Sequence, residues 1–296
     1  MLVSDLERQF LISKESSPYC ECFGNDHFSQ RIFKGKHIWH EMVWSRQINF
    51  EYALVEKGES IMLTQIREEE IRIEVRRIYE QAKKNLHFKE FALSESALSD
   101  TIPGYHASEL PFAAYEEDKF AVLFVDMRKS TQRAERLRGE KTFLTMHIYL
   151  PTVIAVIREH HGYPIDIMGD GVMALFGGKY SKRAISICVQ DAGLCGESLL
   201  QVRESIINHI LEEENIEAID FGVGIDYGRV IVTKIGFKDI FDVKAFGDCI
   251  NKASKYSSVF NEVKVGKRIK QKWPKGKTGR IRFEGTDKDG YTMQRI

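Results

Sequence analysis

The stretch FAVLFVDMRKST (120–131), followed further along the chain by HGYPIDIMGDGVMALFGG (161–178), predicts the centre of the fold. The first apolar run ends on Asp126, which predicts a buried strand that delivers a carboxylate into a loop. The second run ends on Asp170 between two glycines, which predicts a two-residue hairpin with this acid at its tip. If the two strands are neighbours, both carboxylates meet at one edge of one sheet. Such a pair favours a hard divalent cation, Mg²⁺ or Mn²⁺.

The bulk composition describes an ordinary globular chain. With 296 residues and a formal net charge of zero, there is room for one large domain or two, each with a substantial core. No apolar run is long enough to span a membrane, and the N terminus carries acids early and lacks a signal-peptide core. We therefore expect a cytoplasmic protein with no membrane partner. The five cysteines are odd in number, and we expect them to be free thiols.

The N-terminal third contains one clear helical pattern. Residues 64–87 have no glycine or proline and are dense in good helix formers, with an apolar stripe at spacings of four and three. The stripe fits either a coiled-coil seam or a helix packed on its own domain. A polar stretch with Pro103-Gly104 is a plausible linker. We place a boundary near residue 110, after a mainly helical region, 1–110, whose regulatory role is a hypothesis.

After residue 110 the elements alternate regularly. The pattern predicts a strand at 120–126, helices within 130–160, a hairpin at 163–177, a long amphipathic helix within 181–212, a second hairpin around Tyr227-Gly228, a helix at 248–258 and closing strands. This β-α-β-β-α-β order predicts an α+β fold of the ferredoxin-like type, an antiparallel sheet with helices on one face.

A third block, FGDCINKASK (246–255), opens a helix. Asn251 and Lys255 lie one turn apart, hence on the same face. An amide and a cation on one face suit ribose or phosphate oxygens. The alternative for this block alone is a capped surface helix.

Together the three blocks resemble the catalytic domain of the class III nucleotidyl cyclases, the adenylyl and guanylyl cyclase superfamily. VDMRKST is similar to the first metal-aspartate segment of that family, and IDIMGDGVMALFGG to the second. FGVGIDYGRV and FGDCINKASK are similar to its hairpin and transition-state helix. The resemblance covers roughly residues 115–296 and implies a class III nucleotide cyclase catalytic domain at 111–296.

The resemblance also implies a role for individual residues and a homodimer with composite active sites. Lys255 stands where the family usually has arginine. A lysine keeps the positive charge that stabilises the α-phosphate but cannot form the two parallel hydrogen bonds of a guanidinium. The resemblance implies two Mg²⁺ or Mn²⁺ ions per site, bound by Asp126, Asp170 and the carbonyl of Met127. It implies that Asn251 binds the ribose. The implied phosphate-binding residues are Lys129, Ser130, Thr131 and Lys288.

Two positions set the base in this superfamily, and here they hold Asp166 and Lys244. Adenylyl cyclases have Lys and Asp there, guanylyl cyclases Glu and Cys, so the adenine pattern is reversed and ATP is disfavoured. Asp166 can accept a ring N–H and Lys244 can donate to a carbonyl oxygen. Uracil and guanine both present that pair; cytosine fits only if the two targets are exchanged. Alternatively, the two side chains only pair with each other across the dimer interface.

The altered pair resembles the pyrimidine cyclases of the bacterial Pycsar antiphage system. We therefore expect a uridylate cyclase that converts UTP to cyclic UMP and pyrophosphate, with cytidylate second and guanylate third, and a separate effector protein that responds to the product. The main alternative is a catalytically inactive homologue that serves as a regulatory domain. Nucleic-acid binding through the basic stretch 268–280 is disfavoured by the zero net charge.

Overall fold

The computed structural model describes residues 63–85, 101–102, 105–106, 110–112, 114–179, 181–237, 241–275, 281–285 and 290–296. All of them belong to one compact unit, Ala53–Ile296. Lys288, and with it the expected grip on the triphosphate, lies outside the described residues, as do residues 1–62. The domain boundary near residue 110 stays a prediction.

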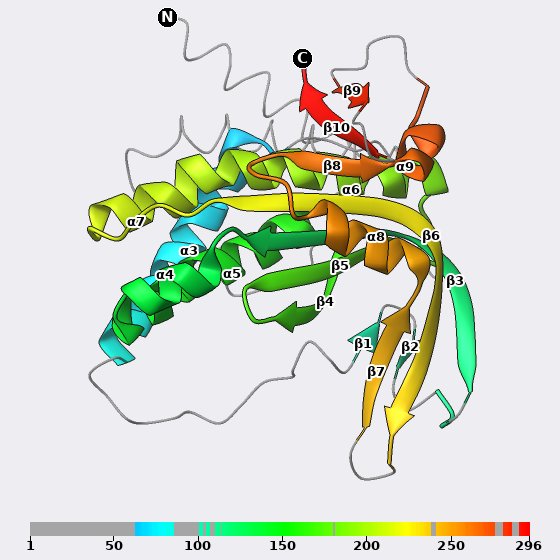
Figure 1. Cartoon of the computed structure of the whole chain (residues 1–296), viewed down its shortest axis with the longest axis horizontal. Coiled ribbons are helices and arrows are strands. Elements are labelled where there is room, and N and C mark those ends of the chain that lie inside the picture. The colour runs from blue at the N-terminus through cyan, green and yellow to red at the C-terminus, as the bar shows by residue number, and fades with distance from the viewer. Residues whose placement is uncertain are drawn as a thin grey trace, which may run out of the picture. The chain divides into compact units, whose positions relative to one another are not determined.

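One mixed sheet organises this unit (Figure 1). Its strands run in the order β4-β5-β3-β6-β8-β10-β9, and β7 pairs with β6 beside this path. The strands are β3 (Tyr115–Met127), β4 (Tyr163–Met168), β5 (Gly171–Gly177), β6 (Phe221–Gly236), β7 (Phe241–Phe246), β8 (Val263–Gly266), β9 (Ile281–Gly285) and β10 (Gly290–Arg295), with a separate small hairpin of β1 (Thr101–Ile102) and β2 (Tyr105–His106). The order β4-β5-β3-β6 confirms the ferredoxin-like arrangement. One pairing differs from the expected antiparallel sheet, because β6 and β8 are parallel.

Strand β3 is the centre of the fold because both of its faces are buried. Ala121, Leu123 and Val125 enter the larger core with the long helices. Phe120, Val122 and Phe124 enter a second, smaller core on the opposite face. Successive side chains of a strand alternate between faces, so an unbroken apolar run marks a strand covered on both sides.

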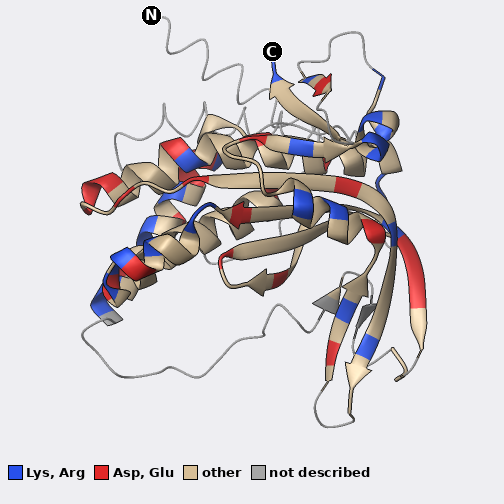
Figure 2. Ribbon diagram, viewed as in Figure 1, with Lys and Arg blue, Asp and Glu red and all other residues tan. Residues whose placement is uncertain are grey.

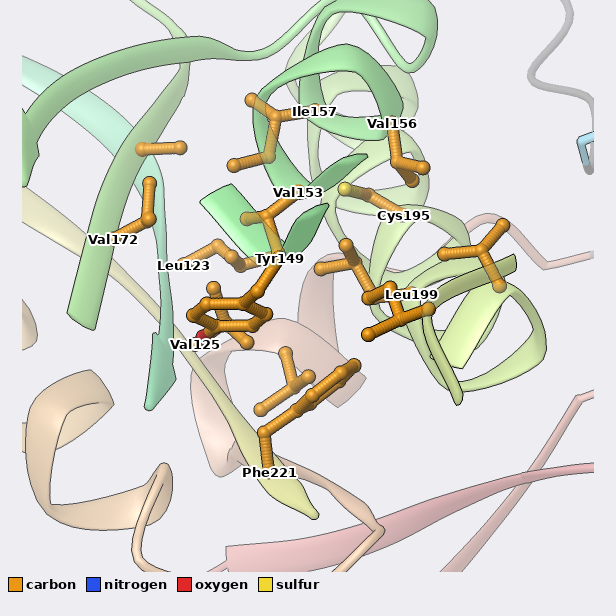
Figure 3. Packing of buried hydrophobic residues seen from close by; sticks show 14 of the residues in the cluster. Leu123, Val125, Tyr149, Val153, Val156, Ile157, Val172, Cys195, Leu199 and Phe221 are labelled. Carbon is orange, nitrogen blue, oxygen red and sulfur yellow. The ribbon is translucent and has the colours of Figure 1, made fainter. Parts of the chain in front are cut away.

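The larger core lies under a layer of helices, whose packing Figure 3 shows around Tyr149 and Phe221. The helices of the chain are α3 (Gln65–Asn85), α4 (Ser130–Arg136), α5 (Gly139–Glu159), α6 (Ile185–Val202), a π-helical segment (Arg203–Asn208), α7 (His209–Glu213), α8 (Asp248–Tyr256) and α9 (Lys267–Lys272). Helix α5 continues through Pro151 as one helix. Ile71, Val75 and Tyr79 of α3 are buried in this core. Helix α3 therefore packs on its own domain, and the coiled-coil alternative is not adopted.

Helix α8 covers the opposite face, so the helices are not confined to one side of the sheet. Its Cys249 and Ala253 are buried with the smaller core. Gly222 and Gly224 of β6 allow its backbone to approach, because a Cβ at either position would overlap backbone atoms in the segment Ala253–Val259. The spacing of the two glycines matches the period of a strand, which places both on the face that α8 covers.

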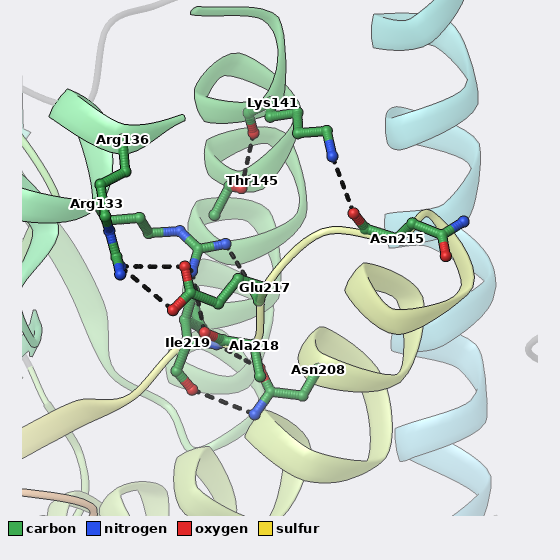
Figure 4. Close-up of polar contacts among 9 residues, drawn as sticks. All are labelled: Arg133, Arg136, Lys141, Thr145, Asn208, Asn215, Glu217, Ala218 and Ile219. Carbon is green, nitrogen blue, oxygen red and sulfur yellow. Dashed lines mark hydrogen bonds and ion pairs between the residues drawn. The ribbon is translucent and has the colours of Figure 1, made fainter. Parts of the chain in front are cut away.

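The turn before β6 is tied to the helices that follow β3 (Figure 4). Arg133 of α4 donates to the carbonyl of Ala218 at 3.0 Å and to that of Glu217. Asn208 accepts from the amide of Ile219 at 2.8 Å and donates to its carbonyl at 3.2 Å. These bonds satisfy backbone groups that have no partner in a strand, and they hold α4 close to the start of β6.

Two further expectations concern the whole chain. Among the described residues, no helix is long and apolar enough to cross a membrane. Cys188, Cys195 and Cys249 are buried free thiols. Cys20 and Cys22 lie outside the described residues.

Candidate functional site

The two carboxylates that follow the central strands meet at one edge of the sheet. Asp126 pairs across β3 and β5 with Gly171, the residue after Asp170. The Oδ1 atom of Asp126 is 3.5 Å from the position that a Cβ on Gly171 would take. Burial raises the pKa of Asp126, the Arg128 guanidinium lowers it, and the carboxylate of Asp170 raises it further. The sequence-based prediction of two convergent acids therefore agrees with the geometry.

A buried tyrosine lies beneath this pair. Tyr149 of α5 is fully buried beside Val125 and Phe221 (Figure 3), and its hydroxyl has no hydrogen-bond partner among the described residues. Burial, then the charges of Asp170 and Asp126, raises its pKa well above the usual value. The hydroxyl therefore stays protonated and remains available as a donor towards the acids.

Arg128 places a positive charge on the acid pair. Its Nη2 group donates to Oδ2 of Asp126, and its Nη1 group donates to the carbonyl of Ser258 at 3.1 Å. The guanidinium therefore links the loop after β3 to the end of α8. Any cation that binds Asp126 competes with this contact.

The donor set fits a hard divalent cation. The Oδ2 atom of Asp170 is buried without a hydrogen-bond partner among the described residues, so it is a desolvated oxygen that a cation would satisfy. Within the described part of the chain, no group of three or more His, Cys, Asp and Glu side chains is arranged to hold a metal ion. The available set is thus two carboxylates and backbone oxygen, a combination that suits Mg²⁺ or Mn²⁺ rather than zinc. Met127, the last residue of β3, carries the carbonyl expected to complete it.

The loop after β3 turns sharply into α4. Lys129 has a left-handed backbone with φ of 56°, and α4 then begins at Ser130. Thr131 and Ser130 lie in the first turn of that helix, where backbone N–H groups have no partner within the helix. Lys129, Ser130 and Thr131 thus follow Asp126 closely in the chain, and their role in phosphate binding stays a prediction.

Helix α8 presents the polar pair predicted from the third block. Asn251 and Lys255 are both exposed, whereas Cys249 and Ala253 face the core. The two side chains are therefore accessible to a ligand from the side away from the sheet.

Asp166 and Lys244 come together within one chain. Lys244 Nζ lies 3.2 Å from Oδ2 of Asp166 and 2.8 Å from Oδ2 of Asp242. The hydrogen bond to Asp242 is the largest cause of a raised pKa at Lys244, and the bond to Asp166 adds to it. All three side chains are partly exposed, so the ammonium is a permanent donor and Asp166 an acceptor at an open site.

Comparison with known proteins places these motifs in a family. Residues 112–288, more than half of the chain, match the sequence profile of the adenylate and guanylate cyclase catalytic domain. The chain belongs to this family. Helix α3 lies before the matched region of this cyclase-family chain, although it contributes to the same core.

Several relatives carry specific names. A cytidylate cyclase from Escherichia coli is 32% identical over 130 residues, 42% of this chain and 28% of that protein. A uridylate cyclase from Gulbenkiania mobilis is 29% identical over 164 residues, 53% of this chain and 62% of that protein. An adenylate cyclase from Anabaena cylindrica is 26% identical over 137 residues, 46% of this chain and 26% of that protein. The chain thus spans less than two thirds of the length of each of these relatives.

Solved structures support the same fold. The adenylyl cyclase CyaB from P. aeruginosa matches with a TM-score of 0.54 and 19% identity, over 62% of this chain and 96% of that one. The guanylyl cyclase Cya2 matches with a TM-score of 0.50 and 21% identity, over 60% and 91%. The class III cyclase fold, predicted from three short blocks, is therefore confirmed.

Sequence reasoning missed Arg128 and Tyr149 as residues of the acid site. Arg128 lies inside the quoted VDMRKST block, but a side chain two positions after a strand end has no fixed direction. Tyr149 is one of several apolar-compatible residues on α5, and only the tertiary structure shows that its buried hydroxyl lies within the electrostatic influence of both acids.

The basic stretch near the C terminus gives a mixed surface. Figure 2 shows Lys and Arg clustered on α9, while acidic residues gather on the outer part of β3 and at the end of α7. Arg268 of α9 is paired with Asp226 and Asp248. This distribution favours a solvated helix over a nucleic-acid surface.

Proposed function

We propose that this chain is a pyrimidine nucleotide cyclase that converts UTP to 3′,5′-cyclic UMP and pyrophosphate. The observation that carries the proposal is the Lys244–Asp166 pair at 3.2 Å. Its ammonium can donate to O4 of uracil while its carboxylate accepts from N3–H. The relatives named uridylate cyclase and cytidylate cyclase support the pyrimidine class. A bound base would cover Lys244 and Asp166, so a mismatched base would leave a polar group buried and unsatisfied, at a cost of about 1–3 kcal/mol.

CTP is the second candidate substrate and GTP the third. Cytosine presents an amino donor and a ring acceptor, which the same two side chains serve only if Asp166 takes the amino group and Lys244 the ring nitrogen. Guanine presents N1–H and O6 with the polarity of uracil. Adenine presents the same amino donor and ring acceptor as cytosine, with the polarity opposite to that of uracil. ATP is expected to be the poorest substrate because Asp166 and Lys244 reverse the residue pair of adenylyl cyclases.

The proposed mechanism assigns each residue a positioning or electrostatic role. Asp126, Asp170 and the Met127 carbonyl would hold two Mg²⁺ or Mn²⁺ ions, which class III cyclases generally use. When bound, such ions would lower the pKa of the substrate's ribose 3′-hydroxyl and neutralise phosphate charge. Asn251 orients the ribose so that this hydroxyl attacks the α-phosphorus in line. Lys255 balances charge on the α-phosphate as pyrophosphate leaves. The β- and γ-phosphates are held by Lys129, Ser130, Thr131 and Lys288.

The complete active site is proposed to form in a homodimer. Asp126 and Asp170 of one copy face α8 and the base-reading side chains, Asp166 and Lys244, of the other copy. The exposed position of Asn251 and Lys255 supports this arrangement, because in one chain they face away from the sheet. Ile235 and Phe241 are also exposed, at the end of the β6–β7 ribbon. Such apolar side chains suit a second copy of the chain.

The substrate is tested by incubating the purified protein with each of the four nucleoside triphosphates and Mn²⁺ and identifying the product by mass. We expect a 3′,5′-cyclic pyrimidine monophosphate, and no product from Asp126→Ala or Asp170→Ala. Rapid formation of cyclic AMP would overturn the base assignment. Absence of any cyclic product with all four substrates would favour the alternative, an inactive regulatory domain.

The composite site is tested by mixing two inactive variants. Asp126→Ala lacks the acid site and Asn251→Ala lacks the ribose contact, so a mixed dimer regains one intact site of two. If subunits exchange at random, activity should recover to about a quarter of the wild-type value. No recovery after subunit exchange would place all site residues in one chain.

In the cell, the cyclic product is proposed to serve as a second messenger in antiphage defence, read by a separate effector protein. The product should then accumulate during infection. Cells that carry Asp126→Ala should lose both the product and any protection, and protection retained by that variant would refute this role.

A further inference from the structure

An ion cluster ties the first turn of α8 to β6 and α9. Arg268 of α9 donates from Nη2 to Oδ2 of Asp226 at 2.5 Å and to Oδ2 of Asp248 at 3.0 Å. Its Nη1 group donates to Oδ1 of Asp248 at 3.3 Å. Asp226 lies on β6, and Asp248 is the first residue of α8. One guanidinium therefore links three elements that are not neighbours in sequence.

The cluster is set into the fold. The side chain of Asp226 is only 2% exposed, whereas those of Arg268 and Asp248 are 34% and 59% exposed. Burial lowers the pKa of Arg268, but its hydrogen bonds to Asp226 and Asp248 outweigh this and raise it. The bond to Arg268 is the largest cause of a lowered pKa at Asp248. Asp226 is thus a buried carboxylate paired with the Arg268 guanidinium, and it depends on that cation for compensation of its charge.

Two glycines make room for the cluster. A Cβ at Gly266, the residue before α9, would overlap Oδ1 of Asp226. A Cβ at Gly228 of β6 would lie 3.0 Å from Nη1 of Arg268. Because neither glycine has a side chain, the backbone at both positions can lie against the ion cluster. The distance between α9 and β6 therefore depends on the contact between Arg268 and Asp226.

The opposite end of α8 is also held by an arginine. Arg128 donates to the carbonyl of Ser258, two residues after the helix, at 3.1 Å. Between the two ends, the backbone of α8 contacts β6 at Gly224. Rotation of α8 about its axis, or sliding along β6, would break at least one of these contacts.

We infer that Arg268 is a positioning residue for the nucleotide: through Asp248 it sets the rotation of α8, and hence the direction in which Asn251 and Lys255 are presented. This rests on the proposed roles of those two side chains. The inferred role of Arg268 requires no contact with the substrate. Its effect is transmitted by one hydrogen-bonded carboxylate at the start of the helix, and a small rotation there displaces both side chains together.

The test compares steady-state kinetics of Arg268→Met, Arg268→Lys and Asn251→Ala with the triphosphate that is turned over best. We expect Arg268→Met to lower kcat at least about tenfold with KM changed less than about threefold, as for an interaction needed mainly in the transition state. Arg268→Lys should recover part of kcat, since it keeps the charge and loses the fork. Arg76→Met, which removes a surface ion pair between α3 and α7, is the matched control and should leave kcat unchanged.

A double variant separates positioning from stability. If Arg268 acts by placing Asn251 and Lys255, then adding Arg268→Met to Asn251→Ala should lower kcat less than it does in the wild-type background, because only the effect through Lys255 remains. A full multiplicative loss in the double variant, or an unchanged kcat in the single one, would overturn the inference. Wild-type activity in Asn251→Ala would instead overturn the proposed role of that residue.

A second route avoids the buried charge that Arg268→Met leaves at Asp226. Asp248→Ala removes the link from Arg268 to α8, together with the exposed Lys252–Asp248 pair within the helix, and keeps the Arg268–Asp226 pair. If Arg268→Met does not fold, the kinetics of Asp248→Ala test the inference instead. The same loss of kcat, at a thermal midpoint close to that of the wild type, supports the inference, and unchanged kcat overturns it.

Discussion

Lys244 Nζ lies 3.2 Å from Oδ2 of Asp166, although the two residues are 78 positions apart in the chain. Their strands, β7 and β4, are not neighbours, because β5, β3 and β6 lie between them. The pair forms because β6 bends beyond its middle and brings β7 back towards β4 (Figure 1). Strand β1 contacts both, with Ile102 buried in the core that also contains Ile165 and Val243.

This pair leads to a prediction about selectivity. Asp166→Glu combined with Lys244→Cys should raise the ratio of kcat/KM for GTP over UTP at least about tenfold, because the new pair has the residue types of guanylyl cyclases and removes the donor for O4. The ratio is measured with both substrates at saturating Mn²⁺. Lys83→Cys, at an exposed ion pair on α3, is the control. An unchanged ratio would show that these side chains do not touch the base.

The contact between Arg128 and Asp126 predicts a change in metal affinity. Arg128→Met should tighten binding of Mn²⁺ in the absence of nucleotide at least about threefold, because it removes a cation that competes for the same carboxylate. Titration followed by electron paramagnetic resonance measures the dissociation constant. Arg136→Met, on the exposed side of α4, should have no effect. Weaker binding in Arg128→Met would show that the arginine supports the metal site rather than competing with it.

The close approach of β6 and α8 predicts a sharp difference between two glycine substitutions. Gly224→Ala should lower the free energy of unfolding by at least about 3 kcal/mol, because its Cβ would overlap the backbone of α8, which cannot move aside as a side chain can. Gly139→Ala, at the start of α5, has open space around the new methyl group and should be neutral or stabilising. Denaturant unfolding of both variants tests this, and equal stabilities would contradict the close approach.

Buried His160 predicts a pH dependence of stability. Burial lowers its pKa from 6.5 to about 3, and its Nε2 atom lies 2.9 Å from the hydroxyl of Ser198. Between about pH 3 and 6.5 the unfolded chain binds a proton that the folded chain does not. This contribution to the unfolding free energy is therefore complete above pH 6.5 and falls as the pH decreases, by about 1.4 kcal/mol per unit.

The wild-type slope alone cannot test this, because Glu197 acts in the opposite sense. Burial raises its pKa from 4.5 to about 7, so its contribution falls as the pH rises through that window. The measurement is therefore the change in unfolding free energy between pH 7 and pH 5, compared between wild type and His160→Gln. We expect the wild type to lose about 2 kcal/mol more than the variant. Exposed His209→Gln should keep the wild-type slope, and an equal slope in His160→Gln would refute the prediction.

Several features of the site could be read from local sequence. Gly169-Asp170 forms the expected two-residue turn between β4 and β5, since a glycine with φ of 66° is what such a turn requires. Asp126 was expected at the end of an apolar run, and that run is buried on both faces. Asn251 and Lys255 share an exposed helix face because their spacing is one helical turn. The direction of the Arg128 side chain could not be read, nor could the parallel pairing of β6 and β8.

The sequence by itself determined the elements, the residues at their ends and the family, because turns, helix periods and strand alternation depend on neighbours in the chain. The tertiary structure decided which distant side chains meet: Asp166 with Lys244, Arg268 with Asp226 and Asp248, Arg128 with Asp126. The physical reason is that these contacts depend on the bend of β6 and the placement of α8. Both result from many packing contacts across the whole sheet, and no single stretch encodes them.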